Sequence, residues 1–114
     1  MKYKNLVITQ NAKLFQSIRP ILICADLDVS QATTYQKALE LLSCFHYVLV
    51  VADLSFPDVD GIKLIHSLRR LAQVPILAFT SKYTTEEEIQ VLFAGADDYL
   101  DCGVVLDSER CLAH

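Results

Sequence analysis

Short runs of β-branched and other apolar residues alternate with amphipathic segments along the whole chain of 114 residues, and this alternation limits the fold more than any other feature. The run 47–52 is entirely apolar, as expected for a strand that is covered on both faces of a parallel sheet. Strands that alternate with helices through short loops form such a sheet, with helices on both faces. The predicted strands are 6–8, 21–25, 47–52, 75–79 and 98–102, and apolar residues at helical spacing predict helices after residue 11, over 30–43, over 62–71 and from residue 85.

Local signals predict where several helices begin and end. Asn11 is expected to cap the first helix, and Pro20 is expected to stop it. Thr85 and Glu88 have the spacing of a capping box, and Gly95 is expected to help end the helix that they introduce.

Composition excludes several classes of protein. The length fits a single domain, and 53% apolar residues with three glycines and three prolines favour a packed globule over a disordered chain. The net charge of −4 is too acidic for a typical nucleic-acid binder. Residues 84–114 hold eight acidic residues against the single Arg110, so we expect no nucleic-acid contact by this domain and a partner with basic groups.

Cysteine spacing and the N-terminus bear on localisation. Cys24, Cys44, Cys102 and Cys111 form no C-x-x-C pair, so a structural zinc site lacks support, and the three histidines are scattered. The first apolar segment is too short for a signal peptide, and the longest apolar run is too short to span a membrane. We therefore expect a cytoplasmic protein with free thiols and no membrane contact.

Five strands in this order suit the flavodoxin-like α/β fold, a doubly wound parallel sheet of order 2-1-3-4-5, in which ligands bind at the carboxyl ends of the strands where the order reverses. Asp53 ends the most apolar strand, where a carboxylate has no packing reason to be, although it could simply cap the following loop. Thr80 and Ser81 end the next strand, and their hydroxyls could donate to an anion at Asp53 or cap a loop. Tyr99 is an aromatic residue of the type that more often lies in the core. Three acids at 86–88 fit the first turn of a helix, where they favour the helix dipole.

Three ordered motifs carry a family resemblance. The segment 48–54 followed by Pro-Asp-Val-Asp-Gly at 57–61 resembles the phosphoacceptor region of receiver domains of bacterial two-component response regulators. The segments 74–81 and 95–100 are similar to the fourth strand and the fifth-strand entry of OmpR/PhoB-like transcription regulators. The resemblance implies that a sensor histidine kinase phosphorylates Asp53 and that a bound Mg²⁺ ion takes part in this step. It also implies that the Thr80 hydroxyl then moves onto the phosphoryl group and Tyr99 turns inward, which reshapes the face of the fourth helix, fifth strand and fifth helix.

The acidic pair that the family carries after its first strand is missing. Asp26 lies only 27 residues before Asp53, too few for a helix, a strand and a second helix. With 6–8 as the first strand, 43 residues separate Gln10 from Asp53, which leaves room for both units. The pocket positions are then Thr9 and Gln10, and neither is a carboxylate.

The family's lysine is missing as well. Cys102 falls at its position, and Lys82 is a possible substitute that does not match the motif. Mg²⁺ prefers anionic oxygen ligands, so Asp53 with a backbone carbonyl near Ser55 makes a poor site. Cys102 could be a redox-sensitive thiol or, as we expect, a packed and inert one, since a nearby carboxylate raises the pKa of a thiol.

We therefore predict that residues 1–114 form an atypical receiver domain, a signalling module and not an enzyme. Residues 103–114 hold at most the start of a fifth helix, so we expect a truncated last helix and a longer transcription regulator with a C-terminal DNA-binding domain. Output is expected through homodimerisation on the face of the fourth helix, fifth strand and fifth helix, with Asp53 a vestigial or inefficient phosphoacceptor. The alternatives are a flavodoxin-like ligand-binding or enzymatic domain, which lacks a Gly-rich loop after the first strand, and an interaction scaffold in which Asp53 is structural.

Overall fold

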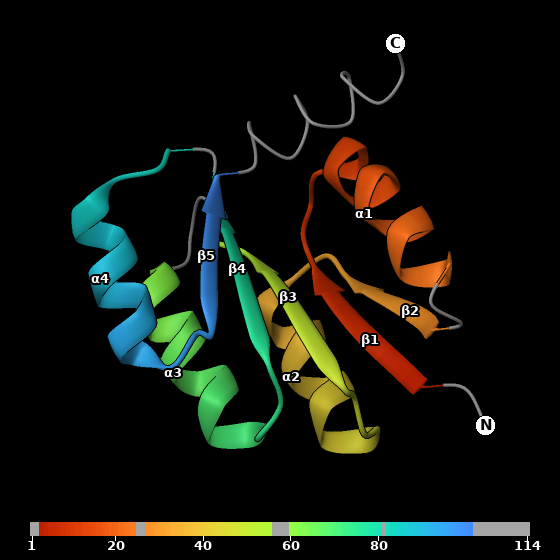
Figure 1. Cartoon of the computed structure of the whole chain (residues 1–114). Coiled ribbons are helices and arrows are strands. Elements are labelled where there is room, and N and C mark those ends of the chain that lie inside the picture. The colour runs from red at the N-terminus through yellow and green to blue at the C-terminus, as the bar shows by residue number, and fades with distance from the viewer. Residues whose placement is uncertain (1–2, 25–26, 56–59, 81, 102–114) are drawn as a thin grey trace, which may run out of the picture.

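Five parallel strands form one sheet in the order β2-β1-β3-β4-β5, with helices in the connections between them (Figure 1). The computed structural model describes residues 3–24, 27–55, 60–80 and 82–101. Its elements are β1 (Tyr3–Ile8), α1 (Ala12–Cys24), β2 (Leu27–Ala32), α2 (Tyr35–Cys44), β3 (Leu49–Asp53), α3 (Gly61–Leu71), β4 (Ile76–Thr80), α4 (Thr85–Ala94) and β5 (Asp98–Asp101). The predicted flavodoxin-like sheet of order 2-1-3-4-5 is confirmed.

Helices cover both faces of the sheet. On one face, Val7 and Val51 of the central strands pack with Leu14 and Ile18 of α1. On the other face, α2, α3 and α4 supply the buried side chains, and Figure 1 shows α2 and α3 behind the sheet. Alternation of side chains along β1 explains the two layers, because successive residues of a strand point to opposite faces. The buried residues of the second layer are Leu6, Ile8, Ala32, Ala38, Tyr47, Val50, Ala52, Leu64, Ile65, Leu68, Ile76, Ala78, Val91, Ala96 and Tyr99.

The prediction of a strand at 21–25 is wrong. Helix α1 continues through Pro20 to Cys24, and β2 pairs with β1 in a register that runs from Tyr3 opposite Leu27 to Ile8 opposite Ala32. Residues 27–32 contain polar side chains because β2 is an edge strand, where one side of the strand faces no neighbour and polar residues are tolerated. Ala32, expected at the start of a helical stripe, instead ends β2 and is buried.

The helix ends follow local capping with one shift. Asn11 caps α1 as predicted, since its Oδ1 accepts hydrogen bonds from the backbone N–H groups of Lys13 and Leu14 at 3.0 and 3.1 Å. The predicted cap of α4 at Thr85 is wrong by one residue. Thr84 is the N-cap, and its Oγ1 accepts from the N–H of Glu87 at 3.1 Å. The acidic first turn is confirmed.

Gly95 ends α4, as predicted, and two features of the structure require a glycine there. Its φ is 128°, a conformation that side chains rarely adopt. A Cβ atom at this position would also meet Cγ of Arg69 at 2.9 Å. The Arg69 guanidinium donates to the Gly95 carbonyl from Nε at 3.0 Å and from Nη2 at 2.6 Å, and it pairs with Asp97 at 2.7 Å. This cluster joins the end of α3 to the turn between α4 and β5.

The remaining boundaries shift by up to five residues from expectation. The helix predicted over 30–43 begins at Tyr35, after its N-cap Thr34. β3 begins at Leu49, so Tyr47 precedes the strand, although its side chain is buried. β5 ends at Asp101, and both Cys102 and the predicted fifth helix lie outside the described residues. No helix in the described part of the chain is long and apolar enough to cross a membrane.

Candidate functional site

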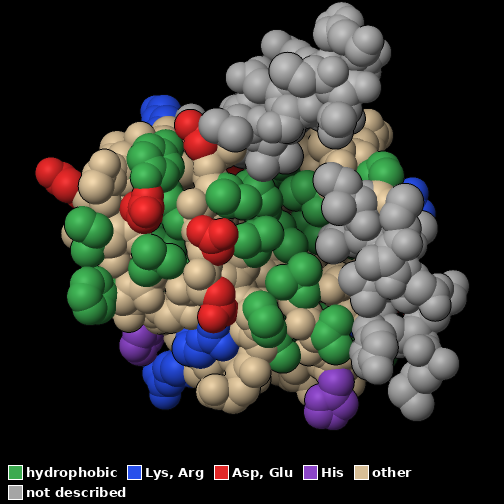
Figure 2. Space-filling model, viewed as in Figure 1, with side chains coloured by type: hydrophobic (Ala, Val, Ile, Leu, Met, Phe, Trp, Pro, Cys, Tyr) green, Lys and Arg blue, Asp and Glu red, His purple; other side chains and the backbone are tan. Residues whose placement is uncertain are grey.

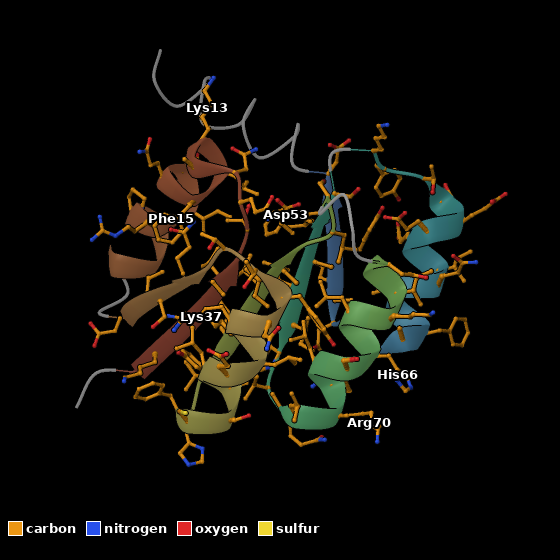
Figure 3. The ribbon with its side chains drawn as sticks, turned by 180° about the vertical axis from the view of Figure 1, so that it is seen from behind. Lys13, Phe15, Lys37, Asp53, His66 and Arg70 are labelled. Atoms are coloured by element: carbon orange, nitrogen blue, oxygen red, sulfur yellow. The ribbon has the colours of Figure 1, made fainter. Side chains whose placement is uncertain are left out.

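The ends of β1, β3 and β4 bring three buried polar side chains to one edge of the sheet. They are Thr9, which is fully buried, Asp53, which is 7% exposed, and Thr80, which is 4% exposed. Figure 3 shows Asp53 at this edge, where β3 ends. β1 lies between β2 and β3, so the edge beside Thr9 is where the strand order reverses. The predicted convergence of the three strand ends is therefore seen in the fold, at the place where doubly wound sheets bind their ligands.

Both oxygens of the Asp53 carboxylate accept hydrogen bonds from neutral donors. The Thr9 hydroxyl donates to Oδ2 at 2.7 Å, and the backbone N–H of Ser55 donates to Oδ1 at 2.9 Å. The Thr9 hydroxyl also accepts from the backbone N–H of Asn11 at 3.0 Å. Sequence reasoning predicted that Thr9 stands at the pocket, but it did not predict that its hydroxyl is bonded directly to Asp53.

The other predicted site residues lie at different depths. Gln10 is exposed, and it is Gln31 of β2 whose amide donates to the Thr9 carbonyl at 3.2 Å. Lys82, the possible substitute for the missing lysine, is exposed, and its backbone N–H donates to Thr80 Oγ1 at 3.1 Å. The position of Cys102 lies outside the described residues.

The donor set at this edge does not fit Mg²⁺. This cation prefers several anionic oxygens at short distance. In residues 9–10 and 53–55 the side chains supply one carboxylate, Asp53, whose two oxygens are already bonded to donors. Within the described ranges no group of three or more His, Cys, Asp or Glu side chains could hold a metal ion. His66 is exposed, and in Figure 3 it lies on α3 well away from Asp53.

Tyr99 is held inward by groups of α4 and the segment before it. Its hydroxyl donates to Oε1 of Glu87 at 2.8 Å, and its ring lies 5.3 Å from the ring of Tyr83 at an angle of 39°. Burial, followed by the hydrogen bond to Glu87, raises the pKa of Tyr99 to about 12, against smaller lowering effects of hydrogen bonds with Thr80 and Thr84. Tyr83 in turn donates to Glu88.

Sequence reasoning missed the Glu87–Tyr99 pair. It explained Glu87 only by its favourable position at a helix N-terminus, and nothing in the local sequence indicates a bond to a strand 12 residues later. The expectation that Tyr99 lies in the core is confirmed, since it is 4% exposed. Tyr99 therefore has a buried ring and a polar partner on α4.

A family model for the response regulator receiver domain matches residues 6–104. Among curated relatives, the KDP operon transcriptional regulatory protein KdpE of Escherichia coli is 32% identical over 95 residues, which are 83% of this chain and 42% of the relative. Protein PetR of Rhodobacter capsulatus is 34% identical over 95 residues, which are 83% of this chain and 40% of the relative. The chain thus spans about two fifths of the length of these relatives.

Solved structures give the same result. The receiver domain of Francisella response regulator 1452 superimposes with a TM-score of 0.77 at 31% identity, over 88% of this chain and 84% of that chain. A response regulator from Burkholderia pseudomallei, solved with a phosphorylated aspartic acid, a calcium ion and citrate, has a TM-score of 0.80 at 27% identity, over 88% of this chain and 59% of that chain. The match of the family model to most of the chain, on a sheet of the corresponding order, leads to one conclusion: the chain belongs to the response regulator receiver domain family, and its relatives include proteins named as transcriptional regulators.

Proposed function

We propose that this chain is the receiver part of a transcriptional response regulator and that it signals through association of two copies on the face of α4 and β5, independently of phosphoryl transfer to Asp53. It is a signalling module and not an enzyme. Curated relatives named as transcriptional regulators are matched over about two fifths of their length, which supports a DNA-binding output domain in the whole protein. The fifth helix, expected to complete the face, lies outside the described residues.

The observation that carries this proposal is the apolar surface of α4. Ile89, Leu92 and Phe93 are 52%, 40% and 88% exposed, and together they line a shallow hollow. Figure 2 shows apolar side chains gathered along the left edge of the molecule, over α4, with acidic side chains among them. Val91 is the buried residue of this helix. Contiguous exposed apolar side chains usually mark an interaction surface, and full burial of a phenylalanine contributes about 1.5–3 kcal/mol.

The charges around α4 are compatible with a second copy of the chain as the partner. The first turn of α4 carries Glu86, Glu87 and Glu88, whereas the last turn of α3 carries Arg69 and Arg70. Arg69 bonds to the Gly95 carbonyl and pairs with the exposed Asp97, so its charge is compensated at the opposite end of α4. A two-fold axis that pairs the α4 helices antiparallel would set the acidic first turn of each copy beside the opposite end of the other helix, which keeps the two acidic turns apart.

Independence from phosphorylation is supported by the pocket. A phosphoryl group on Asp53 would add a negative charge of about −1.5 to −2. Within residues 9–10 and 53–55 there is no second acidic side chain that could help bind a cation to compensate this charge. Within residues 9–10 and 53–55, Mg²⁺ would have Asp53 and the backbone near Ser55 as ligands, so we propose weak binding at most. A sensor histidine kinase is the partner only if phosphoryl transfer survives these losses.

Sedimentation velocity of the purified chain at concentrations up to about 200 µM tests this proposal. We expect a monomer–dimer equilibrium that Phe93→Asp weakens at least about tenfold, because it places a charge in the apolar contact. Phe45→Asp is the matched control, since Phe45 is 45% exposed but lies at the end of α2, away from α4. Asp53→Asn should associate like the parent chain.

Two results would contradict the proposal. A chain that is monomeric at every concentration lacks the association that we propose. Association that appears only with acetyl phosphate and Mg²⁺, and that Asp53→Asn abolishes, would restore phosphorylation as the signal. A flavin or nucleotide that copurifies in stoichiometric amount would instead favour the ligand-binding alternative.

A further inference from the structure

The direction of the hydroxyl proton of Thr9 determines what the Asp53 pocket can accept. The backbone N–H of Asn11 donates to Thr9 Oγ1 at 3.0 Å, so the proton of the hydroxyl itself is directed to Asp53 Oδ2, 2.7 Å away. A hydroxyl carries one proton and two lone pairs, and here the proton is directed to Asp53 while one lone pair accepts from Asn11. Asp53 therefore faces the proton of this hydroxyl, whereas a residue that binds a cation would turn an oxygen lone pair towards the cation.

Thr9 is also fixed by its backbone. Its N–H donates to the Ala32 carbonyl at 3.0 Å, and its own carbonyl accepts from the Gln31 amide at 3.2 Å. The residue is fully buried at the end of β1. These bonds fix the backbone of Thr9, and burial together with the bonds to Asp53 and Asn11 holds the hydroxyl, so a cation at Asp53 Oδ2 would have to displace it.

We propose that the Thr9 hydroxyl takes the place of the cation as the partner of Asp53, so that this pocket is held by hydrogen bonds and excludes divalent cations. Thr9 is a positioning residue in this scheme, because it orients the carboxylate and satisfies its charge. Ser55 completes the arrangement from the other carboxylate oxygen at 2.9 Å. The inference deepens the proposed function, since it names what holds Asp53 when no phosphoryl transfer takes place.

The identity of residue 9 should then decide whether the pocket binds a cation. Thr9→Asp places a second carboxylate beside Asp53, at a position where the present side chain already reaches within 2.7 Å. Two adjacent carboxylates repel each other unless a cation lies between them, so this variant should gain a divalent site. Thr9→Ser keeps the hydroxyl and should bind no cation, like the parent chain.

Mn²⁺ binding, followed by water-proton relaxation, and thermal unfolding in EDTA or in MgCl₂ test this inference. For the parent chain and Thr9→Ser we expect no saturable Mn²⁺ site and equal melting temperatures in the two buffers. For Thr9→Asp we expect saturable binding and a higher melting temperature in Mg²⁺. With a Kd of about 0.1–1 mM, about 10 mM Mg²⁺ would raise its folded-to-unfolded ratio about 10- to 100-fold.

The outcomes separate this inference from the proposed function, because cation binding and self-association are measured in different experiments. Saturable Mn²⁺ binding by the parent chain that Asp53→Asn removes would overturn the inference. So would a folded Thr9→Asp chain that is as indifferent to Mg²⁺ as the parent, or one that stays unfolded in both buffers. A Thr9→Asp chain that is unfolded in EDTA and folds in Mg²⁺ supports it.

Discussion

Replacement of Thr9 by valine should destabilise the folded chain, although the two side chains have nearly the same shape. Thr9→Val removes the donor to Asp53 Oδ2 and the acceptor of the Asn11 N–H. Asp53 is 7% exposed, so water does not readily replace the lost donor. The perturbation therefore isolates one hydroxyl group in a packed site.

The magnitude follows from the two bonds. A hydrogen bond to a charged group contributes about 1.5–3 kcal/mol, and the bond from the partly buried Asn11 N–H contributes about 0.5–1 kcal/mol. We therefore expect the free energy of unfolding to fall by about 2–4 kcal/mol. With a urea m-value of about 2 kcal/mol per M, the midpoint of urea denaturation should fall by about 1–2 M.

A double-mutant cycle with Asp53→Ala separates the Thr9–Asp53 bond from the other losses. The Asn11 contact is lost in both Thr9→Val legs and the Ser55 contact in both Asp53→Ala legs, so the two cancel. The coupling energy between positions 9 and 53 should be about 1.5–3 kcal/mol. A coupling below about 0.5 kcal/mol would show that the hydroxyl is not the partner of the carboxylate and would refute the reasoning.

Four further predictions concern Tyr99 with its partner Glu87, Gly95 and Arg69. Tyr99 should titrate at about 12 in an absorbance titration of the phenolate. Since the folded pKa lies above the unfolded value of 10.0, its contribution to stability is complete below pH 10 and is lost as the pH rises towards 12. Glu87→Gln should lower that pKa, because it removes the carboxylate acceptor and its charge. Gly95→Ala should lower the free energy of unfolding by about 2–4 kcal/mol in urea denaturation, through the positive φ and the clash with Arg69, and an unchanged midpoint would contradict this. Arg69→Met should cost about 2–3 kcal/mol in the same assay, chiefly through the Gly95 carbonyl, since the pair with the exposed Asp97 contributes little.

The sheet and its order could be predicted because the central strands carry a strong apolar signal. β1 and β3 lie between two helical layers, and Val50, Val51 and Ala52 are all buried. The edge strand β2 has no such signal, because only part of it is covered and Asp28 is exposed. The predicted strand was therefore placed on the apolar C-terminal half of α1, which has the more strand-like composition.

Pro20 also misled the prediction of the first helix. A proline inside a helix leaves the carbonyl four residues earlier without its usual partner. Gln16 and Pro20 are both exposed, so water can reach the carbonyl of Gln16, and the cost of the missing bond is small. Whether such a proline ends a helix depends on which side faces solvent, and the local sequence does not specify this.

Spacing along the chain was sufficient to place Thr9 near Asp53, whereas the roles of these residues stay predictions. The count of residues between Gln10 and Asp53 placed Thr9 at the pocket, and the structure joins Thr9 to Asp53. The Glu87–Tyr99 bond depends on how α4 lies against β5, which is a result of packing. Local capping rules explain why Glu87 suits its helix, but they say nothing about which distant hydroxyl its carboxylate meets.

Weak apolar burial and polar tethers together explain how α4 can present an apolar face to solvent. Val91 is its buried residue, so packing alone fixes this helix less firmly than α3, which buries Leu64, Ile65 and Leu68. The first turn of α4 is held through the Glu87–Tyr99 bond, and the turn between α4 and β5 is held through the Arg69 guanidinium. Neither tether involves Asp53, as the proposed independence from phosphoryl transfer requires. Association on α4 that does not depend on Asp53, as we propose, needs a helix that is placed in this way.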